Sequence, residues 1–152
     1  MKSSEPSPPV GVVLAAHGSL AQALLDSAEM ILGAQDRVVT AGLEPHDNLE
    51  TYSEALQAAI ERADQGSGVV VLIDLFGGTP GNAAALRMGQ HKAPLPIVSG
   101  VNLPMLLEVL MAHDASSPTA LAALALEAGN RGMIDVTARV IEQIRASQAS
   151  PG

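Results

Sequence analysis

The chain of 152 residues contains no cysteine and no tryptophan, and Tyr52 and Phe76 are its only residues of the Phe, Tyr and Trp class. The lack of cysteine excludes disulfide bonds and thiolate metal sites. Hydrophobic residues nevertheless make up 47% of the chain, so the core must be built mainly from aliphatic side chains and methionine. The length is typical of one domain with a substantial core.

Positive charge is also scarce, because Lys2 and Lys92 are the only lysines and the formal net charge is -8 at pH 7. Such a surface repels nucleic-acid phosphates and anionic lipids and favours a partner with a basic face. No apolar run is long enough to span a membrane. Residues 1–9 are rich in serine and proline, lack the apolar segment of a secretion signal, and are expected to form a disordered tail. We therefore expect a soluble cytoplasmic protein.

Short apolar runs alternate with helical patterns, which is typical of an α/β fold with a parallel sheet and right-handed connections. Strands are expected at residues 12–16, 37–43, 69–75, 95–99 and, as a short last strand, 133–136. Helices are expected at residues 20–32, 49–63, 80–88, 103–110, 118–129 and 137–147. No internal repeat or second domain is indicated.

Several residue pairs predict where helices begin. Thr79 is expected to be an N-cap with Pro80 in the first helical position. Asp47 and Glu50 have the spacing of a capping box. Asn102 is expected to cap the helix that follows the fourth strand.

Two chemically active side chains come at the ends of apolar strands. His17 follows the first run, and Asp74 is the only charged residue in the third. The carboxyl ends of parallel strands meet at one sheet edge, where α/β proteins bind ligands, so these side chains meet if the two strands are neighbours. A carboxylate on one ring nitrogen fixes the tautomer and leaves the other nitrogen's lone pair facing outward. This pattern favours a nucleophilic or general-base histidine over a histidine that merely ends a strand.

A glycine loop, Gly77-Gly78-Thr79, lies between Asp74 and the next helix. Glycines allow backbone N–H groups to approach a ligand closely. The N-terminus of a helix favours an anion such as a phosphoryl dianion and disfavours an imidazolium. The Thr79 hydroxyl can donate to a phosphoryl oxygen or only cap its helix. Together these features predict a phosphoryl site beside the histidine.

Competing chemistries lack essential parts. A nucleotide-binding P-loop needs a lysine after its glycines, and none is present here. A receiver domain needs an acidic pair after the first strand, where this chain has His17-Gly18. There is no G-x-S-x-G elbow. No ligand spacing supports a metal site built from His17 and Asp74 with one of His46, His91 or His113.

Three motifs together resemble the enzyme IIA domain of the mannose family of the bacterial phosphoenolpyruvate-dependent sugar phosphotransferase system. They are AAHGSLAQALLDSAEMILG, VVLIDLFGGTPGNAAA and IVSGVNLPMLLEVL, which include the Asn102-Leu103-Pro104-Met105 segment. The resemblance covers about residues 10–136. Residues 137–152 extend beyond it as a C-terminal helix and a tail or truncated linker.

The resemblance implies that His17 accepts a phosphoryl group from phospho-HPr and passes it to a IIB component. The expected position of Asp74 makes Nε2, the nitrogen facing away from that carboxylate, the expected acceptor atom. Asp74 would orient the histidine. The phosphoryl group would be bound by Gly18, Gly77, Gly78 and Thr79. No cofactor or metal is implied, and association with a membrane IIC/IID complex would be indirect.

The resemblance also implies a mainly parallel sheet of order 2-1-3-4 with helices on both faces. A C-terminal antiparallel strand, here residues 132–136, would be exchanged across a homodimer. The chain departs from common members at Ala16, Thr79 and Gly81 without losing a catalytic part. Two alternatives stay open: a regulatory module that senses phosphorylation state, and the phosphotransfer subunit of dihydroxyacetone kinase.

Overall fold

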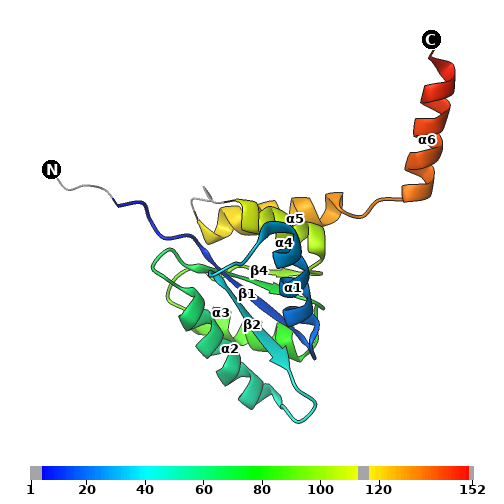
Figure 1. Cartoon of the computed structure of the whole chain (residues 1–152). Helices are drawn as coiled ribbons and strands as arrows, with labels where there is room; N and C mark the ends of the chain where they lie inside the picture. The colour runs from blue at the N-terminus through cyan, green and yellow to red at the C-terminus, as the bar shows by residue number, and fades with distance from the viewer. Residues whose placement is uncertain (1–4, 113–116, 151–152) are drawn as a thin grey trace.

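The computed structural model describes residues 5–112 and 117–150 of the chain. Within those ranges the helices and strands follow in this order: β1 Gly11–His17, α1 Leu20–Leu32, β2 Val38–Leu43, α2 Leu49–Ala63, β3 Val69–Ile73, α3 Thr79–Gln90, β4 Ile97–Ser99, α4 Leu103–Met111, α5 Pro118–Arg131 and α6 Val136–Ala149. Figure 1 shows the sheet in the middle of the body, with helices on both sides of it.

The sheet is parallel throughout and its strand order is β2-β1-β3-β4, which confirms the predicted order. β1 lies between β2 and β3, with His17 opposite Leu43 and Ala15 opposite Ile73. The first six residues of β1 are buried and only His17 at its end is exposed. The strands therefore deliver the loops after β1, β2 and β3 to one edge of the sheet.

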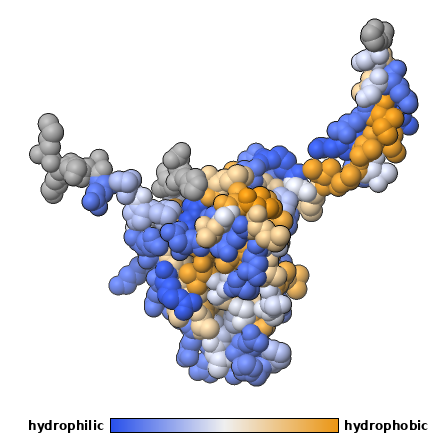
Figure 2. All heavy atoms as spheres, viewed as in Figure 1, coloured by the Kyte–Doolittle hydropathy of each residue, from blue (hydrophilic) through white to orange (hydrophobic). Residues whose placement is uncertain are grey.

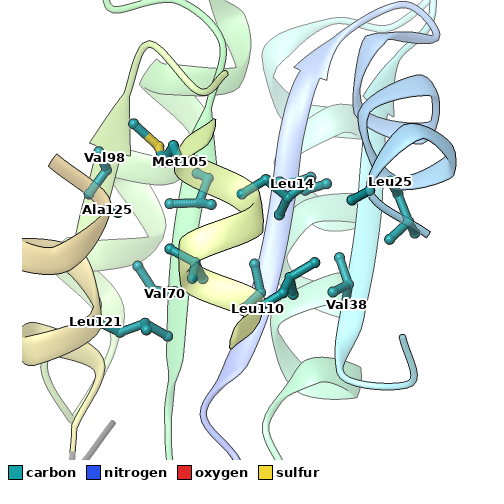
Figure 3. Packing of buried hydrophobic residues seen from close by; sticks show 14 of the residues in the cluster. Leu14, Leu25, Val38, Val70, Val98, Met105, Leu110, Leu121 and Ala125 are labelled. Atoms are coloured by element: carbon teal, nitrogen blue, oxygen red, sulfur yellow. The ribbon is translucent and has the colours of Figure 1, made fainter. Parts of the chain in front are cut away.

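Each face of the sheet has its own aliphatic core, because successive residues of a strand point to opposite faces. On one face Leu14 packs with residues of α1, α4 and α5, including Leu25, Leu110 and Leu121 (Figure 3). On the other face Val13 and Ala15 pack against α2 and α3. A sheet buried on both faces explains the nearly continuous apolar runs in its strands.

One buried cation joins the sheet to a helix end. Arg37, immediately before β2, is only 5% exposed, and its guanidinium donates hydrogen bonds to the carbonyl oxygens of Val109 and Leu110. Burial lowers the pKa of Arg37, and the neighbouring Asp36 partly offsets this. The side chain thus supplies donors to two carbonyls in the last turn of α4, where backbone partners run out; Val109 also accepts from the N–H of Ala112.

The helix starts differ from the predictions in two places. The N-cap of α3 is Gly78, and Thr79 is the first helical residue, so Thr79 does not cap this helix. The capping box of α2 is formed by Asn48 and Thr51 instead of Asp47 and Glu50. In both cases the residue with the extended backbone that an N-cap requires lies one position from the predicted one. The predicted cap of α4 by Asn102 is confirmed.

The chain after α5 does not form the predicted fifth strand. Residues 133–135 are irregular and α6 begins at Val136. A strand needs a neighbouring strand to pair with, and this segment lies away from both edges of the sheet (Figure 1). Exchange of this segment with a second chain therefore stays a prediction.

Helix α6 projects from the body and has no buried residue. Its apolar side chains gather along one side, which Figure 2 shows as a continuous orange band. The exposed apolar residues of this part are Met133, Ile134, Val136, Val140, Ile141 and Ile144. No helix in residues 5–112 and 117–150 combines the length and apolar character needed to cross a membrane.

Of the predicted N-terminal tail, residues 1–4 lie outside the described residues, and residues 5–10 form neither helix nor strand.

Candidate functional site

The structure brings His17 and Asp74 together, as the sequence predicts. His17 is the last residue of β1 and Asp74 follows the end of β3, the neighbouring strand. Asp74 Oδ2 accepts a hydrogen bond from the backbone N–H of His17 at 3.0 Å and lies 2.9 Å from its Nδ1. The carboxylate therefore fixes both the backbone and the ring of the histidine.

The environment of Asp74 favours its charged form. Burial by itself raises the pKa of Asp74, but the backbone and ring hydrogen bonds and the charge of His17 together hold that pKa below its usual range. The second carboxylate oxygen, Oδ1, is buried and has no hydrogen-bond partner among the described residues. The hydrogen bonds that Asp74 does make thus run to His17 through Oδ2.

The imidazole ring is held between the carboxylate and a glycine. When Nδ1 donates its proton to Asp74, the neutral ring carries its lone pair on Nε2. A Cβ added at Gly78 would lie 2.8 Å from Cε1 and 3.2 Å from Nε2 of His17, so the backbone of Gly78 lies against the ring. The His17 side chain is 45% exposed. Nε2 therefore faces both solvent and the start of α3.

The N-terminal end of α3 lies beside this nitrogen. Gly78 is the N-cap, with no side-chain cap, and Thr79 opens the helix. The first N–H groups of a helix have no partner within it and carry the positive end of its dipole. Gly77 has a φ of +88°, a backbone conformation that side chains disfavour. This arrangement can bind an anion attached to Nε2.

Gly18, which follows His17, lies close against the backbone of Gly42 in β2. The sequence predicts Gly18 as a site residue, but Gly42 was missed. The N–H of Gly18 donates to the carbonyl oxygen of Leu43 at 2.9 Å, and Gly18 has a φ of +57°. A Cβ at Gly42 would lie 2.6 Å from the Gly18 carbonyl oxygen, so only glycine fits in this part of β2. A glycine inside an apolar strand was the signal, because such a glycine often marks a close backbone approach.

The site is acidic apart from the helix N-terminus. The segments that follow the four strands, residues 18–19, 44–48, 74–78 and 100–102, contain Glu44, Asp47 and Asp74 but no lysine or arginine. The charges of Asp74 and Asp47, after burial, help to raise the pKa of the buried Tyr52 phenol. An anion bound here would therefore meet backbone dipoles and no lysine or arginine side chain from these segments.

The other candidates lie elsewhere. Asn102 accepts from Met105 N–H and donates to the Gly129 carbonyl oxygen, which joins α4 to α5. His91 follows the last turn of α3, whose first turn is at His17, so it lies at the opposite end of that helix. His113 lies outside the described residues. Among the described residues, no three His, Cys, Asp or Glu side chains are arranged to hold a metal ion.

Comparison with known proteins shows the family of this chain. A family model described as "PTS system fructose IIA component" matches residues 11–126. The chain is 38% identical over 142 residues to the "PTS system mannose-specific EIIAB component" of Escherichia coli strain K12, covering 93% of this chain and 44% of that protein. It is 34% identical over 105 residues to the "PTS system fructose-specific EIIA component" of Bacillus subtilis, covering 69% and 71%.

Solved structures of similar proteins have the same fold. The "Mannose/sorbose specific IIA subunit of phosphotransferase system from Enterococcus faecalis" superposes with a TM-score of 0.75 at 30% identity, over 84% of this chain and 94% of that one. An EIIA component from Streptococcus agalactiae gives a TM-score of 0.78 at 25% identity, over 85% and 98%. The chain spans less than half of the EIIAB relatives it matches. Its domain belongs to the mannose family of enzyme IIA components of the sugar phosphotransferase system.

Proposed function

We propose that His17 carries a phosphoryl group between two protein partners of a sugar phosphotransferase system. One observation supports this above all: Asp74 lies 2.9 Å from Nδ1, while Nε2 is beside the N-cap of α3. The histidine is thus oriented to react at one nitrogen only. The phosphoryl group that it would gain has an anion site next to it.

The transfer needs no proton to leave the ring. The Nε2 lone pair attacks the phosphorus of the donor's phosphohistidine, the new N–P bond forms as the donor's N–P bond breaks, and the electron pair of that bond returns to the donor imidazole. The proton on Nδ1 stays in its hydrogen bond to Asp74, whose charge stabilises the ring as it becomes positive. Transfer between two similar nitrogens changes little in energy, so positioning and charge stabilisation are the protein's main contribution.

The phosphoryl oxygens would be bound by Gly18, Gly77, Gly78 and Thr79. Since Gly78 rather than Thr79 is the N-cap, the hydroxyl of Thr79 has no capping hydrogen bond and is available to donate to a phosphoryl oxygen. The unpaired N–H groups of the first turn of α3 supply further donors.

The partners we propose are phospho-HPr as donor and a IIB component as acceptor, with no cofactor. The support is the family, in which relatives bear names such as mannose-specific EIIAB and fructose-specific EIIA component. The chain would act in the cytoplasm and meet a membrane IIC/IID complex only through the IIB component. The net charge of -8 suits basic partner faces and weak, transient docking.

We also propose that the chain functions as a homodimer, joined through the segment after α5. The support is the row of exposed apolar side chains from Met133 through α6. A helix of this length without packing partners is only marginally stable in water, so a second copy covering it would stabilise it.

Phosphorylation of the purified protein by phosphoenolpyruvate, enzyme I and HPr tests the carrier role. We expect intact mass to increase by one phosphoryl group that is labile in acid, and we expect no increase in His17→Ala. Adding a IIB component should then remove the group. Absence of phosphorylation of a folded wild-type protein would refute the carrier role. Phosphorylation without transfer to any IIB component would favour a regulatory module.

A further inference from the structure

The most exposed aromatic residue of the protein is part of the loop that closes the site. Phe76 is 87% exposed and Leu75 beside it is also exposed, whereas the only tyrosine, Tyr52, is fully buried. Both exposed residues lie between Asp74 and Gly78. Large aromatic rings dominate the energetics of protein interfaces, and an exposed ring beside a reactive group points to a contact with another protein.

The loop from Asp74 to Gly78 contacts His17 at both of the loop's ends. Asp74 accepts hydrogen bonds from His17, and Gly78 lies against the imidazole ring. Phe76 is only two residues from each of these contacts. Its distance from Nε2 is thereby limited to the span of a few residues.

Phosphoryl transfer to Nε2 requires the donor protein to contact the loop. Transfer in line between two histidines requires the reacting atoms to approach to about 3–3.5 Å. The surface around the donor's phosphorylated residue must then contact what protrudes beside Nε2. Phe76 and Leu75 are the exposed large apolar side chains of the loop that contacts the His17 ring.

The charges around the loop define the partner further. Glu44 and Asp47 follow β2, which ends beside His17, and no lysine or arginine lies in the segments after the strands. A cationic rim on the partner would complement these carboxylates and the phosphoryl group. An apolar depression inside that rim would accept the ring.

We propose that Phe76, assisted by Leu75, is the apolar anchor through which the phosphoryl donor protein recognises this chain. The donor presents an apolar depression next to its phosphorylated side chain, flanked by lysine or arginine. This inference rests on the proposed function, since the transfer to His17 is what brings the partner to the loop.

The test is the initial rate of phosphorylation of Phe76→Ala as the concentration of phospho-HPr is varied. We expect KM for phospho-HPr to rise by about tenfold or more, as truncation of an aromatic anchor typically causes. The rate at saturating donor should stay within about twofold of wild type, because the ring takes no part in the chemistry. Phe76→Leu should restore part of the affinity.

Met30→Ala is the matched control, because Met30 is 89% exposed but lies in the last turn of α1, away from the site. It should leave KM unchanged. An unchanged KM in Phe76→Ala would overturn the proposal, and so would a lower saturating rate at unchanged KM, which would indicate a role in positioning the loop. Failure of the proposed function has a different result, since wild type would then not be phosphorylated at any donor concentration.

Discussion

At the scale of single residues, the site depends on how tightly the His17 ring is confined. Asp74 fixes Nδ1, and the bare backbone of Gly78 lies against Cε1 and Nε2. A ring confined in this way can present Nε2 in one direction only. Reactions between two positioned groups lose about a hundredfold in rate when a reacting atom moves by about 1 Å.

Gly78→Ala should therefore slow phosphorylation by about a hundredfold, because the new Cβ would lie 2.8 Å from Cε1 and force the ring to turn. The backbone at Gly78, with φ -82° and ψ 174°, accepts alanine, so the fold should be retained. The measurement is the phosphorylation rate by intact mass. Gly89→Ala is the control, since its Cβ would meet nothing within 4 Å. Equal rates in the two variants would contradict the prediction.

Asp74 also predicts a pH dependence of stability. Its pKa is held below the ordinary value of an aspartate in the folded protein, so folding favours the charged carboxylate. Its contribution to the free energy of unfolding is therefore complete above the unfolded pKa. It is lost as pH falls below 3.8 through the lower folded pKa.

Urea unfolding of wild type and Asp74→Asn over a pH series checks this. Below about pH 5 the stability difference between the two proteins should change as the carboxyl group of the wild type is protonated. A difference that stays the same down to about pH 3 would show that the hydrogen bonds from His17 do not favour the charged form.

At the scale of helices and strands, the sequence predicts most of these elements but misplaces several of the residues at which they begin or end. The strands are recognisable because a sheet covered on both faces needs continuous apolar runs. Thr79 is as good an N-cap as Gly78 by local chemistry. Gly78 caps α3 because its backbone is the extended one, and this backbone conformation depends on the tertiary structure rather than on local side-chain chemistry.

The two central residues of the site are also predictable from the sequence. His17 and Asp74 come at the ends of strands, and parallel strands bring their ends together. The place of Gly42 inside an apolar strand signals a close backbone approach, but its partner, Gly18, is defined only when β1 and β2 pair. The segment at 133–136 was predicted as a strand from its apolar residues, but those residues lack a neighbouring strand.

The end of α4 provides a prediction at this scale. Arg37→Met keeps the aliphatic stem but removes the donors to the carbonyl oxygens of Val109 and Leu110. We expect the free energy of unfolding to fall by about 1–3 kcal/mol, since hydrogen bonds from a charged group are lost and the carbonyl oxygen of Leu110 loses its donor. Urea unfolding measures this, with the exposed Arg62→Met of α2 as a control within about 0.5 kcal/mol of wild type. Equal stability of both variants would contradict the role of Arg37.

At the scale of the whole molecule, α6 predicts self-association. Ile144 lies in the middle of its apolar side and is half exposed in a single chain. If a second copy covers this side, Ile144→Asp buries a charge and should convert the dimer into monomer.

Sedimentation velocity over a range of protein concentrations measures that change. Ala146→Asp adds the same charge to the polar side of α6 and should leave the dimer intact. A monomeric wild type at every concentration would refute the homodimer. Phosphorylation of His17 is measured separately and does not depend on this result.

The position of β1 between β2 and β3 has a consequence for when the site comes into existence. His17 and Asp74 are 57 residues apart in sequence, and only the pairing of β1 with β3 brings them into contact. A nascent chain therefore has no site until its first half has been synthesised and its central strands have paired. With His17 as the phosphoryl carrier proposed above, phosphorylation would mark only folded molecules, and the phosphorylated fraction at saturating donor would report how much of a destabilised variant is folded inside a cell.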